Sequence, residues 1–393
     1  MNTITKRILQ ELSLIDKEPQ YILDLSKFVQ NFIDFKRSFE KVFGKDNVII
    51  GYSFKTNSHP KILRAVKGMN GYAEVVSPEE LAKAEVLMHE NDRIEYERII
   101  YNGVIHDSIG RFKVAAQGGI VNVDNYSQLS DLSKMARMTK THIKLGIRIM
   151  MKASSRFGVL HGSEEYKRTI EEFVKNPYLK LVGIHCHTYG GRDITSWNIK
   201  ARKAATIGKE LGVEYIDFGS NMYGFMEKKL ERQFESITPT PREYANVIYK
   251  AMKDVYGNEE LPLVIMEPGT PVVADTMAIL SNVINVRKVN GRDMITADCS
   301  IYDMGFLPMT KVVPMDVISN EISKNEKIDV RNATIYGYTC TEGDILYRNY
   351  TGSIRIGDKL VFGNLGAYGR ELSNNFIRNR LNTYCLKSKK PLF

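Results

Sequence analysis

"NVIIGYSFKTNSHP", residues 47–60, joins a short apolar run to a polar turn through a single lysine, Lys55. The run is rich in β-branched and aromatic residues and too short for a helix, so it predicts a buried strand whose end carries Lys55. A buried ammonium group is costly unless it is paired or used covalently. The alternative is that the strand has simply ended and Lys55 lies in solvent.

Seven further runs of this kind follow, and helical stretches separate them. Together the eight runs are NVIIGYSF (47–54), GYAEVV (71–76), RIIYNG (98–103), GIVNVD (119–124), HIKLGIRI (142–149), LKLVGIHCH (179–187), VEYIDFG (213–219) and LPLVIMEPG (261–269). Eight alternating units predict an α/β fold with a closed parallel (β/α)8 barrel. An open doubly wound sheet is the alternative, but no G-x-G-x-x-G follows the first strand.

After about residue 270 the pattern changes to strands without clear helices, which predicts a C-terminal β-sheet or β-barrel domain. The early run PQYILDL (19–25) predicts a strand that joins the same domain. We therefore expect three segments. Residues 1–30 contribute a strand to the β domain, residues 31–272 form the barrel, and residues 273–393 form the C-terminal domain.

Composition restricts the class of protein. With 393 residues and 43% apolar content, the chain is long enough to bury a sizeable core. It has no long uninterrupted apolar stretch and its start is broken by charges, so we expect a cytoplasmic protein with no membrane partner. Cys186, Cys299, Cys340 and Cys385 are far apart, which argues against disulfides and a metal site. The net charge of +9 favours an anionic ligand but is too dispersed to indicate nucleic acid.

Polar residues gather where the predicted strands end, and in a β/α barrel the reacting groups lie at these ends. The residues concerned are Lys55, Arg148, His185, His187, Gly219, Ser220, Asn221, Glu267 and Gly269. Each alone could be a turn or a hydrogen-bonded structural residue. Together they supply an amine, an aromatic ring, an anion-binding backbone and a carboxylate. Pyridoxal phosphate requires this set: a lysine for its Schiff base, a charge partner for its ring nitrogen and a cradle for its phosphate.

Eight motifs in this order resemble one family. They are YSFKTN, AEVVSPEEL, RFGV, GIHCH, IDFGSN, EPG, CTEGDIL and FGNLGAYG. The chain is similar, nearly end to end, to the fold-type III pyridoxal-phosphate decarboxylases, which include diaminopimelate, ornithine, arginine and carboxynorspermidine decarboxylases. The resemblance implies pyridoxal 5′-phosphate as cofactor and α-decarboxylation of an amino acid.

The resemblance also implies roles for single residues. Lys55 would form the Schiff base, His187 would stack on the ring and Glu267 would pair with the ring nitrogen. The other residues expected at the cofactor are Arg148, Gly219, Ser220, Asn221, Gly269 and Tyr368. In the family the site is completed across a homodimer, so Cys340 would enter the neighbouring subunit's pocket, position the substrate and return a proton.

Some positions depart from the family's motifs. Thr270 replaces the arginine of EPGR, Gly190 stands where a serine is usual, and Ser220 and Asn221 interrupt a triple glycine, so the phosphate cradle is altered. At the substrate end, the acid expected directly after Cys340 has moved to Glu342.

The stretch LPMTK (307–311) lacks the arginine and tyrosine that diaminopimelate decarboxylases carry there, and its Lys311 could offer a different cation to the substrate. The loss of these fixed partners for a carboxylate argues against diaminopimelate itself. We expect instead another amino acid or an amino-acid conjugate, as in siderophore or polyamine assembly.

Two other functions fit parts of the pattern. An amino-acid racemase would use the same architecture with a tyrosine from the partner subunit as second base, but CTEGD resembles the decarboxylase motif better. A non-catalytic decarboxylase-like binding protein would not need Lys55, His187, Glu267 and Cys340, all of which are present.

Overall fold

The computed structural model describes residues 1–90, 93–152, 154–234 and 237–388. The chain divides into two compact units. We call residues 32–223 and 238–271 the barrel unit, and residues 1–31, 224–237 and 272–393 the β unit. The segment 224–237 belongs to the β unit, whereas the predicted boundaries place it inside the barrel.

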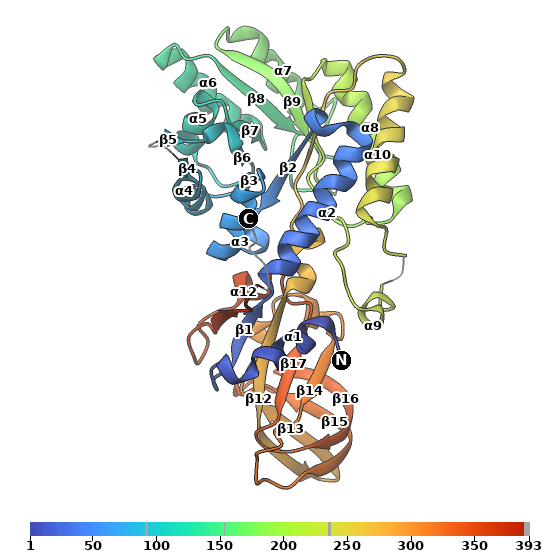
Figure 1. Cartoon of the computed structure of the whole chain (residues 1–393). Coiled ribbons are helices and arrows are strands. Elements are labelled where there is room, and N and C mark those ends of the chain that lie inside the picture. The colour runs from blue at the N-terminus through green and yellow to red at the C-terminus, as the bar shows by residue number, and fades with distance from the viewer. Residues whose placement is uncertain (91–92, 153, 235–236, 389–393) are drawn as a thin grey trace. The chain divides into compact units, whose positions relative to one another are not determined.

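The barrel unit contains a closed ring of eight parallel strands, which confirms the predicted fold (Figure 1). The strands are β2 (Val48–Ser53), β3 (Tyr72–Val75), β6 (Ile99–Tyr101), β7 (Ile120–Val123), β8 (Ile143–Arg148), β9 (Leu179–His185), β10 (Tyr215–Asp217) and β11 (Leu263–Met266). β11 pairs with β2 and closes the ring. Each strand coincides with one of the eight apolar runs, because a strand covered by helices on one side and packed inside the barrel on the other is buried on both faces.

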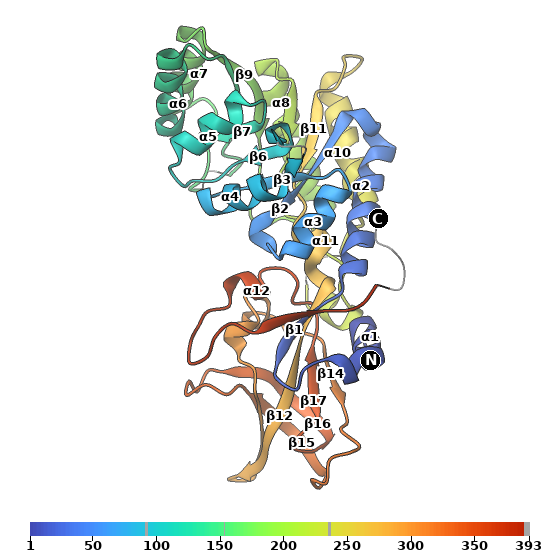
Figure 2. The same cartoon turned by 60° about the vertical axis from the view of Figure 1, so that its left-hand side comes forward.

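Helices follow the strands and lie around the ring (Figures 1 and 2). They are α2 (Leu25–Phe43), α3 (Pro60–Gly68), α4 (Pro78–Leu87), α5 (Ser108–Ala116), α6 (Tyr126–Thr139), α7 (Glu164–Lys175), α8 (Ile194–Leu211) and α10 (Pro241–Tyr256). Their starts follow the sequence signals: Ser163 caps α7, and Thr240 with Glu243 forms a capping box on α10. A two-stranded pair, β4 (His89–Glu90) and β5 (Arg93–Ile94), follows α4.

One tyrosine fills the barrel interior. A Cβ atom on Gly183 would lie 2.0 Å from Cζ of Tyr215, so the glycine leaves room for the ring. The Tyr215 hydroxyl donates to Oδ1 of Asn122 at 2.8 Å. Its ring packs with Ile100, Val182 and Ile265. This packing supports the polar groups at the carboxyl ends of the strands from within the barrel.

The strands of the β unit are β1 (Gln20–Leu23), β12 (Met277–Val289), β13 (Arg292–Ala297), β14 (Met315–Ile318), β15 (Ile328–Tyr336), β16 (Ile345–Ile354), β17 (Lys359–Phe362) and β18 (Asn382–Cys385). They form a sheet in the order β14, β17, β12, β13, β15, β16. β1 pairs antiparallel with β12 and parallel with β18. Short helices accompany them: α1 (Thr3–Glu11), α9 (Lys228–Glu231) and α12 (Gly369–Leu372). One further helix, α11 (Thr270–Val273), follows β11.

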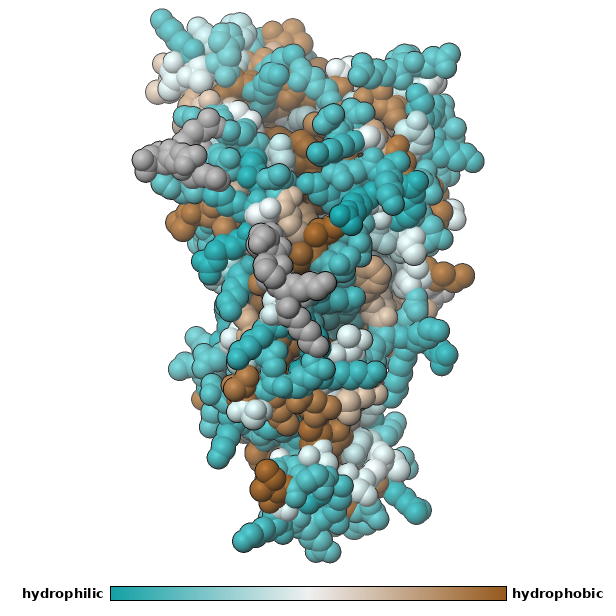
Figure 3. Space-filling view, in the orientation of Figure 1, coloured by the Kyte–Doolittle hydropathy of each residue, from teal (hydrophilic) through white to brown (hydrophobic). Residues whose placement is uncertain are grey.

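Hydrophilic side chains cover most of the face shown in Figure 3, with hydrophobic side chains scattered among them. Among the residues that the structure describes, no helix is both long and apolar enough to cross a membrane.

Candidate active site

Lys55 lies directly after strand β2, in a single 3-10 turn of Phe54–Thr56. Its Nζ donates to Oε2 of Glu74 at 2.5 Å, and the Ser53 hydroxyl donates to the same oxygen at 2.5 Å. Glu74 is buried on β3, while the Lys55 side chain keeps 37% of its surface exposed. Lys55 is therefore held by a buried carboxylate at the strand end rather than left in solvent, and it can still be reached from outside.

Glu267 follows strand β11 and is buried in a network of polar side chains. Asn102, directly after β6, donates from Nδ2 to Oε1 of Glu267 at 2.5 Å and lies 3.2 Å from Oε1 of Glu74. Nε2 of His185 lies 3.5 Å from the other oxygen of Glu267. Asn102 thus connects the carboxylate that holds Lys55 with Glu267, so both belong to one constellation.

The protonation of these acids is set by burial and by one another. Burial, and then the charge of Glu267, raises the pKa of Asp217 well above its usual value. Burial alone would raise the pKa of Glu267 too, but His185 and a hydrogen bond with Asp217 outweigh it and lower this pKa. Asp217 therefore holds a proton and Glu267 is ionised. An ionised carboxylate in a buried site is a partner for a protonated ring nitrogen.

Together with His185, the same two acids could also bind a metal ion. One ligand atom each of His185, Asp217 and Glu267 lies within 4.8 Å of the others. The expectation that the protein holds no metal is left untested by this geometry and stays a prediction.

His187 follows β9 and its ring is fixed from one side. The backbone N–H of Ser220 donates to Nδ1 of His187 at 3.3 Å. A Cβ atom on Gly219 would lie 2.6 Å from that Nδ1, and Gly219 has φ +60°, so glycine is needed there for both space and backbone conformation. Burial, with the positive charge of Lys200, holds the pKa of His187 well below 6.5. The ring is neutral and suited to stacking.

The loop Gly219–Ser220–Asn221 is tied at both ends. The Gly219 N–H donates to Oδ1 of Asp217 at 2.8 Å, and Asn221, with φ +75°, donates from Nδ2 to the carbonyl of Gly190 at 2.8 Å. In the part of the chain that the structure describes, Oγ of Ser220 is buried with no hydrogen-bond partner. Buried polar atoms are almost always satisfied, so this hydroxyl indicates a ligand or water at the loop.

Lys200 of α8 supports this loop from the other side. Its Nζ donates to the carbonyls of Phe218 at 2.6 Å and Ser220 at 3.5 Å, and lies 3.9 Å from the centre of the Trp197 ring. Burial lowers the pKa of Lys200 to about 7. Keeping this lysine charged is costly because it is buried. Its hydrogen bonds to the two carbonyls give it a role in holding the loop.

Replacing Lys200 with methionine should change how stability depends on pH. Between the folded pKa of about 7 and the unfolded pKa of about 10.4, the unfolded chain binds more protons, so Lys200 makes the wild type more stable as pH rises. We expect the unfolding free energy of the wild type, minus that of Lys200→Met, to rise by about 2 kcal/mol between about pH 7 and pH 9. Urea denaturation at both pH values measures this. Lys203→Met, at an exposed position of α8, should give no such slope, and parallel curves for Lys200→Met would contradict the assignment.

Arg148 and Gly269 also lie at this end of the barrel. Arg148 ends β8, is buried, and forms an ion pair with Asp124 at 3.2 Å. Gly269 lies close to Thr56: a Cβ atom there would be 2.0 Å from Oγ1 of Thr56. That buried Oγ1 has no hydrogen-bond partner among the described residues. The structure therefore gathers all the predicted barrel residues at the carboxyl ends of the strands, with Arg148 already paired.

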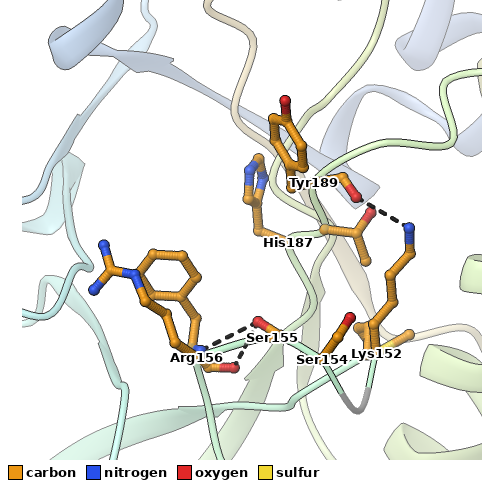
Figure 4. Close-up of a pocket in the computed structure, with 9 residues that line it drawn as sticks. Lys152, Ser154, Ser155, Arg156, His187 and Tyr189 are labelled. Carbon is orange, nitrogen blue, oxygen red and sulfur yellow. Dashed lines mark hydrogen bonds between the residues drawn. The ribbon is translucent and has the colours of Figure 1, made fainter.

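A cavity of about 330 Å³ opens beside His187 (Figure 4). It is lined by Met151, Lys152, Ser154, Ser155, Arg156, Phe157, His187, Thr188 and Tyr189. Nζ of Lys152 donates to the carbonyl of Tyr189 at 3.1 Å. The walls thus carry two basic side chains, which favours a ligand with negative charge.

The remaining predicted residues belong to the β unit. Cys340 and Glu342 are exposed, and Tyr368 precedes α12 with φ +63°. Lys311 donates from Nζ to the carbonyl of Gln233 at 2.7 Å. It therefore anchors the segment 224–237 within the β unit, and its role toward substrate stays a prediction, as do those of the other three.

Sequence reasoning missed Glu74, Asn102 and Asp217 as site residues. Asn102 and Asp217 lie at or just after the end of a short apolar run, in IIYNG and YIDFG, which is the same signal that identified Lys55 and Glu267. Glu74 lies within the run AEVV. The signal did not select Asn102 and Asp217 because a polar residue at a strand end is also common in turns.

Comparison with known proteins gives a family and a set of relatives. The family described as pyridoxal-dependent decarboxylase, pyridoxal binding domain, matches residues 25–274. The diaminopimelate decarboxylase of Methanocaldococcus jannaschii is 25% identical over 96% of this chain and 86% of its own length.

Two solved structures share the fold. The diaminopimelate decarboxylase from Helicobacter pylori complexed with L-lysine has a TM-score of 0.79 at 22% identity, covering 96% of this chain and 94% of that one. The lysine/ornithine decarboxylase from Vibrio vulnificus complexed with putrescine has a TM-score of 0.77 at 18% identity and covers 100% of both chains.

Proposed function

The chain belongs to the pyridoxal-dependent decarboxylases, and we propose that Lys55 and Glu267 serve the removal of the α-carboxyl group from an amino acid or an amino-acid conjugate. One observation carries the proposal. A lysine and an ionised carboxylate end two neighbouring strands of the closed barrel, and Asn102 links them through Glu74. This is the amine and the charge partner that pyridoxal 5′-phosphate requires.

The residues present fit the cofactor. Hydroxyls of Ser220 and Thr56 are buried without a partner in the described part of the chain. A Cβ atom on Gly219 would clash with His187 and one on Gly269 with Thr56, so these glycines let the His187 ring and the Thr56 hydroxyl lie against the two loops. Lys55 would bind the cofactor, Glu267 would face its ring nitrogen and His187 its ring, and the loop Gly219–Asn221 with Gly269 would hold its phosphate.

The barrel residues have separate tasks in the reaction. When bound, the cofactor draws electrons from the carbon that loses carbon dioxide. Glu74 accepts a hydrogen bond from Nζ of Lys55 and so positions this amine at the strand end. Glu267 is ionised and would keep a proton on the ring nitrogen. His187, neutral and fixed by the backbone N–H of Ser220, would keep the ring in place.

The cavity beside His187 favours a substrate other than a simple diamine precursor. Lys152 and Arg156 line the cavity beside His187, so we propose an amino acid or conjugate with further negative charge, as in siderophore or polyamine assembly. Diaminopimelate remains in the set of candidates because decarboxylases of that amino acid are the relatives found.

We also propose a homodimer in which Cys340 and Glu342 of one copy complete the site of the other. Exposure of both side chains in the β unit supports this. In the reaction Cys340 would return the proton to the substrate carbon. The mass of the protein in solution tests the dimer: it should equal twice that of the chain, and a monomer would contradict it.

The experiment that tests the function measures carbon dioxide release by the cofactor-loaded protein. The panel contains lysine, ornithine, arginine, diaminopimelate, glutamate and N-acylated or citrate-conjugated diamino acids. We expect release from one of them, with preference for a compound that carries extra carboxylates. If no compound in the panel released carbon dioxide and one of them was racemised, decarboxylation would be overturned in favour of a racemase. Failure of the protein to bind the cofactor would favour a binding protein.

A further inference from the structure

Two loops meet at the carboxyl end of the barrel, and one arginine joins them. Asn221, in the loop after β10, donates from Nδ2 to the carbonyl of Gly190, in the loop after β9. Arg192, two residues after Gly190, donates from Nε to Oδ1 of Asn221 at 3.2 Å. The hydroxyl of Tyr244 donates to the carbonyl of Arg192 at 2.6 Å, which fixes its backbone.

The guanidinium group of Arg192 is only partly used. Its carbon lies 5.5 Å from the centre of the Tyr223 ring. Among the described residues, its two terminal nitrogens have no hydrogen-bond partner, and no carboxylate lies within ion-pairing distance. The adjacent Asp193 accepts instead from the backbone N–H and the hydroxyl of Ser196, as the N-cap of α8.

Three other cations at this end of the barrel are already engaged. Lys55 is paired with Glu74, Arg148 with Asp124, and Lys200 with backbone carbonyls. Thr270, directly after Gly269, carries no charge. Arg192 is therefore a half-buried cation held against the loop Gly219–Asn221 without a carboxylate to balance it.

A second observation indicates a ligand at the same loop. Ser220 is 6% exposed, and its Oγ has no partner in the described part of the chain. A phosphate offers acceptor oxygens to a hydroxyl, to backbone N–H groups and to the planar fork of a guanidinium group. We propose that Arg192, oriented by Asn221, is the cation that binds the phosphate of pyridoxal 5′-phosphate in this chain; this rests on the proposed function.

Arg192 then acts on one part of the cofactor only. It should contribute to the affinity for pyridoxal 5′-phosphate and not to that for pyridoxal, which lacks the phosphate. Inorganic phosphate should compete with the cofactor at this position. A residue that merely supported the fold would affect both compounds alike, so the pair separates binding from structure.

The test is titration of cofactor-free full-length protein with each compound, followed by absorbance. For Arg192→Gln we expect the Kd for pyridoxal 5′-phosphate to rise about 10- to 100-fold, as for loss of a charge-assisted hydrogen bond. The Kd for pyridoxal should stay within about twofold, and competition by inorganic phosphate should weaken in parallel. Arg202→Gln, on α8 and paired with Asp254, should change none of these constants.

Three results would overturn the assignment. An unchanged Kd for pyridoxal 5′-phosphate in Arg192→Gln would remove Arg192 from the site. An equal loss of affinity for pyridoxal would show a structural role for Arg192. In that case Arg192→Lys, which keeps the charge, would not restore the difference between the Kd values of the two compounds. If the unaltered chain bound neither compound, the proposed function itself would fail, which is distinct from a failure at Arg192 alone.

Discussion

Replacing Lys55 with alanine should reduce carbon dioxide release on the order of a thousandfold or more. The amine of Lys55 ends strand β2 and is held by Glu74, and loss of a covalent catalytic group removes a step that no neighbouring group at this site performs. The measurement is kcat on the substrate that the panel identifies, with the thermal midpoint as a check of folding.

Lys61→Ala is the matched control. Lys61 is an exposed lysine of α3, six residues along the chain from Lys55. Its loss should leave kcat within about twofold. If Lys55→Ala kept the wild-type rate, the site assignment would be wrong, and with it the role of the strand-end network.

Replacing Glu267 with glutamine should lower kcat about 100- to 1,000-fold, as expected for the loss of one preorganised electrostatic partner. The amide has nearly the same shape, so it changes the charge with little change in packing. His185 and the hydrogen bond with Asp217 keep Glu267 ionised, and an amide cannot hold a proton on a ring nitrogen. The defect should appear in kcat more than in KM, because the charge acts on the reacting centre.

Glu260→Gln is the control for this substitution, because Glu260 is exposed in the loop before β11. A wild-type kcat for Glu267→Gln would contradict the role of this carboxylate. A loss of kcat that parallels a fall in the thermal midpoint would also contradict it, because that loss would result from damage to the buried network and not from loss of charge.

The sequence predicted the barrel because its physical cause is local. A strand buried on both faces appears in the sequence as an apolar run. A helix between two such runs is indicated by its N-cap residue, such as Ser163 or Thr240. Lys55 and Glu267 were found because they end two of these runs. The division of the chain was harder: residues 224–237 join the β unit through contacts such as Lys311 with Gln233, which no local pattern reveals.

The contacts within the site were not predictable in the same way. Asn102 bridges Glu74 and Glu267, yet the three residues come from separate strands, and no pattern in the sequence shows that their side chains meet. Arg192 is a still clearer case, since only the fold brings it to Asn221. The roles of Cys340, Glu342 and Tyr368 depend on the family resemblance alone and remain predictions.

Borohydride reduction of the cofactor-loaded protein, followed by proteolysis and mass spectrometry, tests the central claim most directly. It needs no knowledge of the substrate, because reduction fixes the cofactor to whichever lysine carries it. We predict the modification on the peptide that contains Lys55. Modification of another lysine, such as Lys200 or Lys152, or of none, would contradict the account.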